Sequence, residues 1–502
     1  MLSFLQQTPP RALPLLTTRC LATAATATNP SYRDRRPRKE GDISSVFASL
    51  SGSEATTLPS RFADLKTNLI APHHSAVSSS WMRLLASLRT EIDHIFSTGS
   101  EIIPSIDYEQ IHNHARIKPF AHSLKKRGAA IVRGVVAPDT ALSWKAEIRA
   151  YIRANPHTKA FPKDSPAVYE LYWSPGQIKA RAHPKVLATQ AFLMGFWHSR
   201  DPDALVSTQH PVSYADRLRI RQPGDAGFAL GAHVDGGSVE RWEPDGYGRG
   251  VVYDKIWEGK WEEYDPWESS CRLAVQSDLY DGAGACSMFR MFQGWLSMSA
   301  TGPGEGTLLV NPLFRLATAY LLLRPFFSPI CPDVEASGFL DAENWVLDPR
   351  QNSLLQGASL GCTQELHAAL HPHLDLARSM VHVPAVQPGD YVAWHCDSIH
   401  AVDKIHGGKG DSSVMYIPSC PLTEMNAEYL VLQRKAFLAG SPGPDFPGGE
   451  GESRHSGRFG VRDVEEAGGE SGLRGMGLKR WEVEGEREGV RRVLERANNI
   501  IS

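Results

Sequence analysis

The chain has 502 residues, of which 42% are hydrophobic and 22% charged, and its formal net charge is −3 at neutral pH. This apolar content is enough for a sizeable core and excludes wholesale disorder. The near-neutral charge does not indicate the excess of basic residues expected of a protein whose main partner is nucleic acid. No apolar stretch reaches the roughly 18 residues of a transmembrane helix, and seven scattered cysteines form neither a disulfide framework nor a zinc spacing.

The N-terminal part of the chain differs from the rest in composition. Residues 1–33 hold three arginines and no acidic residue, and they are rich in Ser, Thr, Ala and Leu. This composition is typical of an organellar transit peptide. We therefore expect an intracellular protein, mitochondrial if the segment acts as such a signal and otherwise cytoplasmic. Residues 34–75 are polar with little periodicity and are interpreted as a tether.

A domain over residues 76–438 is expected to begin with helices. Apolar residues from Trp81 to Phe96 recur at three- and four-residue steps, which predicts a helix. Gly128–Val136 resembles a buried strand, and Asp139 is a plausible N-cap for the helix that follows it. A further apolar helix is predicted over Val186–Trp197.

Beyond residue 210 the pattern changes to short strands separated by Gly and Pro. The candidate strands are Asp216–Arg221, Gly227–Val234, Ala285–Ser299, Gly306–Asn311, Val381–Val386, Asp390–His395, His400–Val402 and Ser412–Ile417. This texture predicts a mainly β core with flanking helices, an α+β protein built on a sandwich or barrel. Residues 439–475 are rich in Gly, Pro and Glu and are predicted to be disordered, and residues 476–502 are predicted to form a C-terminal helix.

The pattern His-x-Asp occurs three times, at His233/Asp235, His373/Asp375 and His395/Asp397. On a strand, residues two apart point to the same face, so one imidazole and one carboxylate can bind a single metal ion. The chain around His373 has a helical pattern, in which residues two apart diverge, and little strand-like chain follows His395. Only His233 precedes a long β-rich stretch, and we predict that His233 and Asp235 bind a metal.

The third ligand is expected where a Pro-Gly-Asp turn begins one strand and a short turn leads to the next. Both His395 and His400 are candidates. His400 is preferred because it opens a new strand with apolar neighbours, and His395 would then lie near the site without binding the metal. Two histidines and one carboxylate with open positions favour non-haem Fe(II) over zinc.

Several strings of the chain resemble a known family. They are His233–Trp242, Phe289–Trp295, Glu305–Thr307, Trp394–His400 and Ser412–Pro418, within a match from about residue 80 to 435 that resumes near residues 475–499. They are similar to the microbial family called domain of unknown function fourteen seventy-nine, within the Fe(II)/2-oxoglutarate-dependent dioxygenase superfamily.

The resemblance implies a double-stranded β-helix, or jelly roll, with Fe(II) bound by His233, Asp235 and His400. It also implies 2-oxoglutarate as cosubstrate, O2 as oxidant, and oxidation of a small molecule with release of succinate and CO2. Two alternatives remain open at this point. One is a cupin-like metalloenzyme that works without 2-oxoglutarate, and the other is a catalytically silent jelly roll that serves as a binding module.

The far carboxylate of 2-oxoglutarate requires a cation, and arginine is the preferred partner. Many members of the superfamily place this arginine after the distal histidine, but here no arginine lies between His400 and Pro418. Arg217, Arg219 and Arg221 alternate along a predicted strand and share a face, and Arg290 lies in an otherwise apolar strand. We therefore predict Arg219, Arg221, Arg290 and Ser413 as cosubstrate-binding residues.

The segment that follows Asp235 is long for a connection in a compact domain. Residues 236–271 contain Trp242, Trp257, Trp261 and Trp267 among acids and glycines. Such a segment can form an aromatic lid over a substrate pocket, or its tryptophans can pack against the exterior of the barrel. The sequence favours neither.

Overall fold

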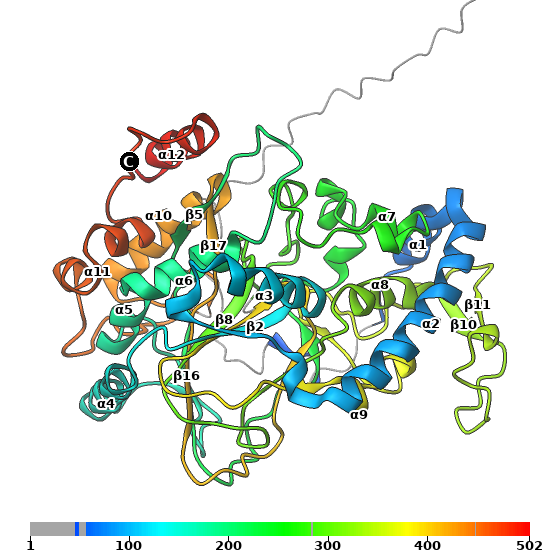
Figure 1. Cartoon of the computed structure of the whole chain (residues 1–502), viewed down its shortest axis with the longest axis horizontal. Coiled ribbons are helices and arrows are strands. Elements are labelled where there is room, and N and C mark those ends of the chain that lie inside the picture. Colours follow the sequence, from blue (N-terminus) through cyan, green and yellow to red (C-terminus); the bar gives the residue numbers. More distant parts are fainter. Residues whose placement is uncertain (1–45, 50–56, 283–284, 447) are drawn as a thin grey trace, which may run out of the picture. The chain divides into compact units, whose positions relative to one another are not determined.

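The apolar face that begins at Trp81 belongs to α2 (His74–Thr98), which ends where Gly99 adopts a positive φ of 63°. The structure, a computed structural model, describes residues 46–49, 57–282, 285–446 and 448–502, all within one unit that spans Pro37–Ser502. Two groups of helices flank the strands of this unit. One group contains α2 and α8, and the other contains α4, α5 and α11 (Figure 1).

The helices of the described residues alternate with long irregular segments. Their bounds are α1 (Arg61–Ile70), α2 (His74–Thr98), α3 (His114–Arg127), α4 (Pro138–Ala154), α5 (Pro175–Ala182), α6 (Pro184–Met194), α7 (Asp254–Trp257), α8 (Arg315–Leu323), α9 (Leu376–Ser379), α10 (Glu424–Ala439), α11 (Val461–Gly475) and α12 (Glu488–Ile501). None of these helices is long and apolar enough to cross a membrane.

The strands are short. Their bounds are β1 (Ser105–Asp107), β2 (Ala129–Arg133), β3 (Ala160–Phe161), β4 (Val168–Tyr169), β5 (Val206–Val212), β6 (Leu218–Arg221), β7 (His233–Val234), β8 (Phe292–Ser297), β9 (Leu308–Val310), β10 (Phe327–Pro329), β11 (Trp345–Leu347), β12 (Gln364–Glu365), β13 (Val381–His382), β14 (Tyr391–His395), β15 (His400–Val402), β16 (Ser412–Tyr416) and β17 (Cys420–Thr423). The mixed α+β class predicted from the sequence is confirmed.

Two larger sheets organise these strands. One has the order β1-β2-β14-β8-β16-β6-β4-β3 and the other the order β12-β7-β15-β9-β13, while β10-β11 and β17-β5 form separate pairs. In the order of the chain, β6, β8, β14 and β16 belong to the first sheet, and β7, β9, β13 and β15 belong to the second. The pairings among these eight strands are antiparallel. As a result, β7 and β15 are direct neighbours although they lie far apart in the chain.

The tryptophans of residues 236–271 are part of the core. Trp242 donates its indole N–H to the carbonyl of Leu322 over 3.1 Å, and Trp261 donates to the carbonyl of Ser80 over 3.1 Å. Trp242, Trp257, Trp261 and Trp267 are at most 6% exposed, and none of them lines the cavity at the candidate metal site. Their bulk therefore buries apolar surface against neighbouring helices, and the aromatic-lid interpretation is wrong.

The C-terminal third of the chain contradicts another prediction. Residues 439–475 contain α11 rather than disorder. The glycines that suggested disorder instead allow close packing, because a Cβ on Gly468 would lie 2.1 Å from the carbonyl oxygen of Ala182 in α5. Glu452 is completely buried and accepts hydrogen bonds from the backbone N–H groups of Tyr172 and Trp173 over 2.7 Å each.

Three boundaries also differ from prediction. The tether proposed for residues 34–75 is corrected in its described C-terminal part, because α1 begins at Arg61. The N-cap of α4 is Ala137, with Pro138 as the first helical residue, so Asp139 lies inside the first turn. The strand predicted over Gly227–Val234 shrinks to two residues. The predicted transit peptide, residues 1–33, lies outside the described residues.

Candidate metal centre

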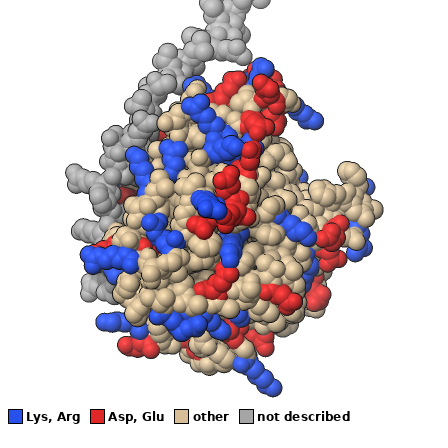
Figure 2. Space-filling model, turned by 90° about the vertical axis from the view of Figure 1, so that its left-hand side faces the viewer, with Lys and Arg blue, Asp and Glu red and all other residues tan. Residues whose placement is uncertain are grey.

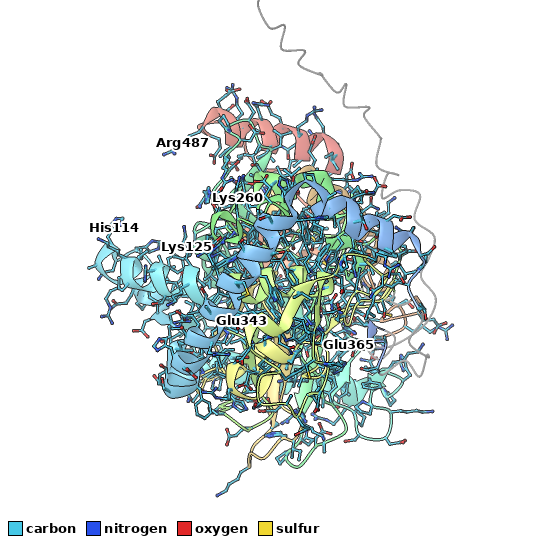
Figure 3. All side chains as sticks on the ribbon, turned by 90° about the vertical axis from the view of Figure 1, so that its right-hand side faces the viewer. His114, Lys125, Lys260, Glu343, Glu365 and Arg487 are labelled. Atoms are coloured by element: carbon cyan, nitrogen blue, oxygen red, sulfur yellow. The ribbon has the colours of Figure 1, made fainter. Side chains whose placement is uncertain are left out.

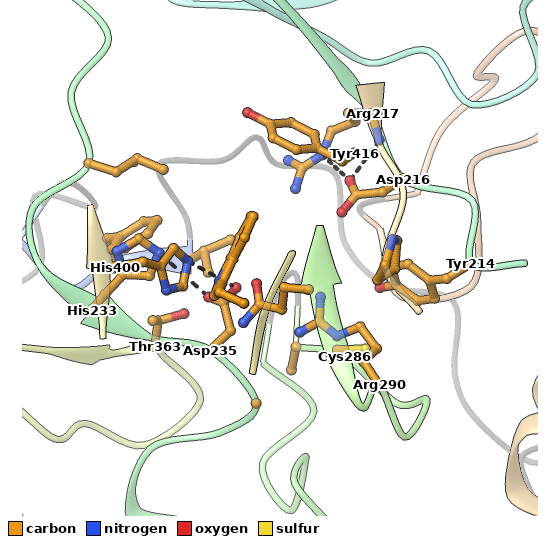
Figure 4. A pocket seen from close by; sticks show the side chains of 18 of the residues that line it. Tyr214, Asp216, Arg217, His233, Asp235, Cys286, Arg290, Thr363, His400 and Tyr416 are labelled. Carbon is orange, nitrogen blue, oxygen red and sulfur yellow. Dashed lines mark hydrogen bonds and ion pairs between the residues drawn. The ribbon is translucent and has the colours of Figure 1, made fainter. Parts of the chain in front are cut away.

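The strand register places two histidines directly opposite each other. His233 begins β7 and His400 begins β15, and these residues are cross-strand partners in the antiparallel pair. Such partners share a face of the sheet, and their ring centroids are 4.1 Å apart. Figure 4 shows both imidazoles on the same wall of a cavity, with Asp235 beside them. On the far side of β7, Glu365 of β12, labelled in Figure 3, pairs with His233.

Asp235 completes the group. Its Oδ1 lies 3.7 Å from Nε2 of His233, and its Oδ2 lies 3.7 Å from Nε2 of His400. The chain turns sharply just after it, because Gly236 and Gly237 adopt φ values of 81° and 85° that favour glycine. Arg241 donates hydrogen bonds to the carbonyl oxygens of Asp235 and Gly237, which fixes this turn.

Hydrogen bonds set the tautomer of both imidazoles. Nδ1 of His233 lies 2.7 Å from the carbonyl oxygen of Gly231, and Nδ1 of His400 lies 3.1 Å from that of Ser398. A carbonyl oxygen only accepts, so each Nδ1 carries the proton and donates. Each Nε2 therefore presents a lone pair toward Asp235, which is the arrangement that metal-binding histidines adopt.

The protonation states also suit a cation. Burial, together with the neighbouring His233, lowers the pKa of His400 to about 3. Burial alone raises the pKa of Asp235, but interactions with the adjacent imidazoles of His233 and His400 and with the charges of Arg290 and Arg241 outweigh it and hold that pKa below its usual value. Two neutral imidazoles and one ionised carboxylate are the forms that bind a divalent metal.

His395 does not belong to this group. Its Nε2 lies 2.9 Å from the carbonyl oxygen of Pro266, and its Nδ1 accepts the backbone N–H of Asp397 over 3.0 Å. Its ring stacks on Trp197 with centroids 4.6 Å apart. Both ring nitrogens are therefore occupied. His395, Cys396 and Asp397 form a second cluster of metal-ligating types among the described residues, but Asp397 is held by Arg272.

The three residues line a cavity that opens to solvent. Strands of both large sheets line it, as do Phe47 and Phe446 from segments outside these sheets. Figure 4 shows Tyr214, Arg217, Arg290 and Tyr416 across from the metal-ligating group. The cavity thus combines a group of three potential metal ligands with several cationic and hydroxyl-bearing side chains.

Comparisons with known proteins identify the family. A profile of the Gig2-like family matches residues 56–478. The uncharacterised protein YbiU of Escherichia coli K12 is 31% identical over 392 residues, which are 76% of this chain and 87% of YbiU. The chain belongs to the Gig2-like family.

Solved structures resemble this Gig2-like protein over most of its length. GlcNAc Inducible Gene 2, GIG2 (DUF1479), from Candida albicans has a TM-score of 0.78 and 30% identity, covering 89% of this chain and 96% of that one. The hypothetical protein JW0805 of Escherichia coli at high pH has a TM-score of 0.70 and 29% identity, covering 86% and 100%. DUF1479 is the family that the sequence motifs indicated, and that prediction is confirmed.

The arginines predicted to bind the cosubstrate are not equivalent in this Gig2-like protein. Arg219 lines the cavity and is 3% exposed. Its Nη2 donates to the carbonyl oxygen of Gly306 over 3.0 Å and to Oγ of Ser412 over 3.3 Å, while its Nε is buried without a hydrogen-bond partner. Arg217 also lines the cavity, but it is paired with Asp216 over 3.1 Å.

Arg221 and Ser413 do not line the cavity. The guanidinium of Arg221 pairs with Asp225 over 2.6 Å and donates to the carbonyl oxygens of Asp403 and Lys404. The hydroxyl of Ser413 donates to Asp411 over 2.5 Å. Both side chains are therefore occupied within the fold, and neither is placed to bind a ligand beside the metal group. Arg290, by contrast, lines the cavity.

Several cavity residues were not found from the sequence. Phe47 packs edge-on against His233 with ring centroids 4.9 Å apart, although its segment gave no signal beyond polarity. Trp394 and Tyr416 lie within motif strings, but the strings alone do not show which side chains face the cavity. The alternation of residues along β14 and β16 identifies that face only once the register is known.

Proposed function

We propose that this chain is a non-haem Fe(II)/2-oxoglutarate-dependent oxygenase that oxidises a small molecule and releases succinate and CO2. The observation that carries the proposal is the group of two histidines and one aspartate on one wall of a cavity. Nitrogen and carboxylate donors from two histidines and one acid, with open positions opposite, suit Fe(II). His233, Asp235 and His400 would hold the metal.

The strand order supports a double-stranded β-helix, the jelly roll expected from the resemblance. Eight strands, β6 to β9 and β13 to β16, cross between two antiparallel sheets. In this arrangement the second and seventh strands, β7 and β15, are neighbours in the smaller sheet, which brings His233 and His400 together. The mouth of such a barrel is a common place for a small-molecule site.

Arg219 is the side chain best placed to anchor the far carboxylate of 2-oxoglutarate. It is the cross-strand partner of Val414, and Val414 and Tyr416 both face the cavity. Its buried Nε lacks a partner, and such a donor costs free energy unless a ligand satisfies it. A carboxylate matches the planar guanidinium, so the residues present fit this cosubstrate.

The metal, when bound with 2-oxoglutarate, supplies the activation of O2 that oxidises the substrate. The chain's own residues prepare for that chemistry. The carbonyls of Gly231 and Ser398 orient the imidazoles, and the Arg241 hydrogen bonds hold the turn that carries Asp235. Phe47 covers one edge of His233 and excludes water from that side.

The proposed substrate is a small molecule rather than a nucleic acid. The metal group lies in a concave cavity whose lining combines apolar and aromatic side chains with a few polar groups, as small-molecule sites do. Lysines and arginines are interspersed with acidic side chains on the face shown in Figure 2, where no broad basic patch is seen.

Anaerobic titration of the purified protein with Fe(II) and 2-oxoglutarate tests the proposal. We expect a weak visible metal-to-ligand absorption band that His233→Ala abolishes. Arg219→Gln should raise the Kd of 2-oxoglutarate by roughly 10-fold or more, because it removes a charge-assisted pair, without weakening metal binding. Arg116→Gln, at an exposed position of α3, is the matched control.

Three results would contradict the proposal, each in a different way. Metal binding without the band, and without succinate formation, would favour the cupin-like alternative. Absence of metal binding would favour the silent binding module. An unchanged Kd of 2-oxoglutarate in Arg219→Gln would remove the anchor assignment alone.

A further inference from the structure

Two buried donors in the cavity wall have no partner. Gln293 of β8 and Trp394 of β14 are 5% and 4% exposed, and both line the cavity. They are direct cross-strand partners, so their side chains lie on the same face of the sheet. Nε2 of Gln293 and Nε1 of Trp394 are both buried without a hydrogen-bond partner among the described residues. Unsatisfied buried donors are rare in folded proteins and call for an explanation.

A cation lies in the same part of the cavity wall. Arg290 is three residues before Gln293 in the chain and also lines the cavity. Among the described residues no carboxylate lies within ion-pair distance of its guanidinium, which lies 5.6 Å from the ring centroid of Tyr214 and interacts at longer range with Cys286 and Asp235. Figure 4 shows Arg290 directed into the cavity on the side of Asp235 and Cys286. Its N–H groups are therefore available to a ligand.

These donors lie away from the Arg219 end of the cavity. Arg219 pairs with Val414, and Val414 pairs with Ser297, so Ser297 marks the level of Arg219 on β8. Gln293 lies four residues further along the same strand, which corresponds to about 13 Å. The two sets of donors therefore start from backbone positions that lie well apart along the sheet, and we assign them to two different carboxylates.

We propose that Arg290, Gln293 and Trp394 form the binding site for a carboxylate group of the substrate, separate from the cosubstrate anchor. The inference rests on the proposed function, because it assigns Arg219 to 2-oxoglutarate. A carboxylate offers two oxygens that accept from the guanidinium and from both orphan N–H groups. A single unpaired cation matches a monoanion better than a phosphate ester, which carries up to two charges.

Ligand binding to the holoprotein tests this site. Protein loaded anaerobically with Fe(II) and saturating 2-oxoglutarate is titrated with short-chain, aromatic and hydroxylated monocarboxylic acids, each beside its primary amide. The readouts are the shift of the metal-to-ligand band and, in ¹⁵N-tryptophan-labelled protein, the indole N–H signal that Trp394→Phe removes. We expect at least one acid, but not its amide, to move both signals.

Variants separate this site from the cosubstrate anchor. Arg290→Gln should weaken binding of that acid by roughly 10-fold or more, while the Kd of 2-oxoglutarate stays within about threefold of the wild type. Gln293→Leu should also weaken acid binding, yet leave the melting temperature equal or higher, because it removes an unsatisfied buried donor. If Gln293 served only the fold, Gln293→Leu would lower the melting temperature and leave acid binding unchanged. Arg116→Gln controls for loss of positive charge.

Three outcomes would overturn the proposal. Equal binding of acids and amides, or no acid binding at all, would show that the wall does not recognise a carboxylate. Loss of 2-oxoglutarate binding in Arg290→Gln would make Arg290 the cosubstrate anchor. Absence of the metal-to-ligand band in the wild type is the separate failure of the proposed function, and the indole signal still reports acid binding in that case.

Discussion

At the scale of single residues, His395 and His400 show why the third ligand was left open by the sequence. Both histidines lie near the same turn, and both are buried. The choice depends on register, because His400 is the cross-strand partner of His233 whereas His395 pairs with Phe292. A preference for His400 could be drawn from its place at the start of a strand, but its pairing with β7 is a long-range property that local patterns do not encode.

This difference predicts opposite effects of two substitutions. His400→Ala should lower the affinity for Co(II), a spectroscopic substitute for Fe(II), by more than about 100-fold. Loss of a residue that only orients a metal ligand already lowers metal affinity by about 10- to 100-fold, and this substitution removes the ligand itself. His395→Phe should lower the free energy of unfolding through the lost bond to Pro266, while Co(II) affinity stays within about threefold. Titration followed by visible absorption measures both. Equal losses of affinity would contradict the assignment.

The arginines at and beside β6 also show what the sequence alone does not predict. Arg219 and Arg221 alternate along β6 as predicted, whereas Arg217 directly precedes that strand. The alternation does not predict that the loop after β6 supplies Asp225 to Arg221, or that the carbonyls of Asp403 and Lys404 close around the same guanidinium. Which arginine stays available for a ligand depends on the segments that pack around β6, not on the strand itself.

At the scale of elements, the turn between β14 and β15 is fixed by a buried ion pair. Nη2 of Arg272 lies 2.5 Å from Oδ2 of Asp397, and Tyr253 and Tyr264 donate their hydroxyls to the same carboxylate over 3.1 and 2.9 Å. Arg272 directly follows the tryptophan-rich segment, so this pair connects that segment to the turn that presents His400.

Arg272→Met should therefore affect both stability and the metal group. It leaves the Asp397 carboxylate buried and unpaired, and we expect a loss of about 3–5 kcal/mol in the free energy of unfolding. Co(II) affinity should fall by roughly 10-fold as the turn loosens. Urea unfolding and Co(II) titration measure these effects. The double variant Arg272→Met/Asp397→Asn should be more stable than Arg272→Met, and equal stabilities would contradict the role of the pair.

Most strands of the two larger sheets could be predicted from the sequence. Their lengths, and the structure of the glycine-rich segment, could not. Predicted strands such as Ala285–Ser299 are longer than the observed β8. A run of apolar residues indicates burial, but a strand also requires backbone hydrogen bonds to a neighbouring strand. Residues 439–475 looked disordered because glycines lower apolar content. In the fold those glycines permit α11 to approach α5, and Glu452 satisfies backbone N–H groups that are distant in sequence.

Glu452 makes stability depend on pH. Burial raises the pKa of this carboxyl from 4.5 to about 7, despite the hydrogen bonds from Tyr172, Trp173 and Tyr151. The folded state thus binds the proton more tightly than the unfolded chain. The contribution of Glu452 to the free energy of unfolding is therefore fully present below about pH 4.5 and is lost as the pH rises toward 7. The difference is about 3 kcal/mol.

Glu452→Gln should flatten this dependence, since the amide stays neutral throughout. Urea unfolding at intervals between pH 5 and 8 measures the effect, with all other conditions fixed. Glu465→Gln, at an exposed position of α11, is the matched control and should keep the wild-type slope. A wild-type slope in Glu452→Gln would assign the pH dependence to other groups.

At the scale of the whole molecule, the metal group joins strands that the chain brings together from distant positions. β7 and β15 pair only in the folded sheet, so a metal held by His233, Asp235 and His400 would bind the folded state and not the unfolded chain. Binding of that kind stabilises the protein by mass action, by about 2.7 kcal/mol at a free ligand concentration of 100 times the Kd. The C-terminal helices pack on the same unit and should share this stabilisation.

The melting temperature of the protein should therefore rise in two steps, and different residues should control each step. Co(II) should raise the Tm of the wild type, and 2-oxoglutarate should raise it further only when Co(II) is present, because the proposed cosubstrate would bind both the metal and Arg219. His400→Ala should lose both steps, and Arg219→Gln should lose the second alone. An increase from 2-oxoglutarate that persists in His400→Ala would mean that the anion binds independently of the metal, and that the two halves of the cavity do not act as one site.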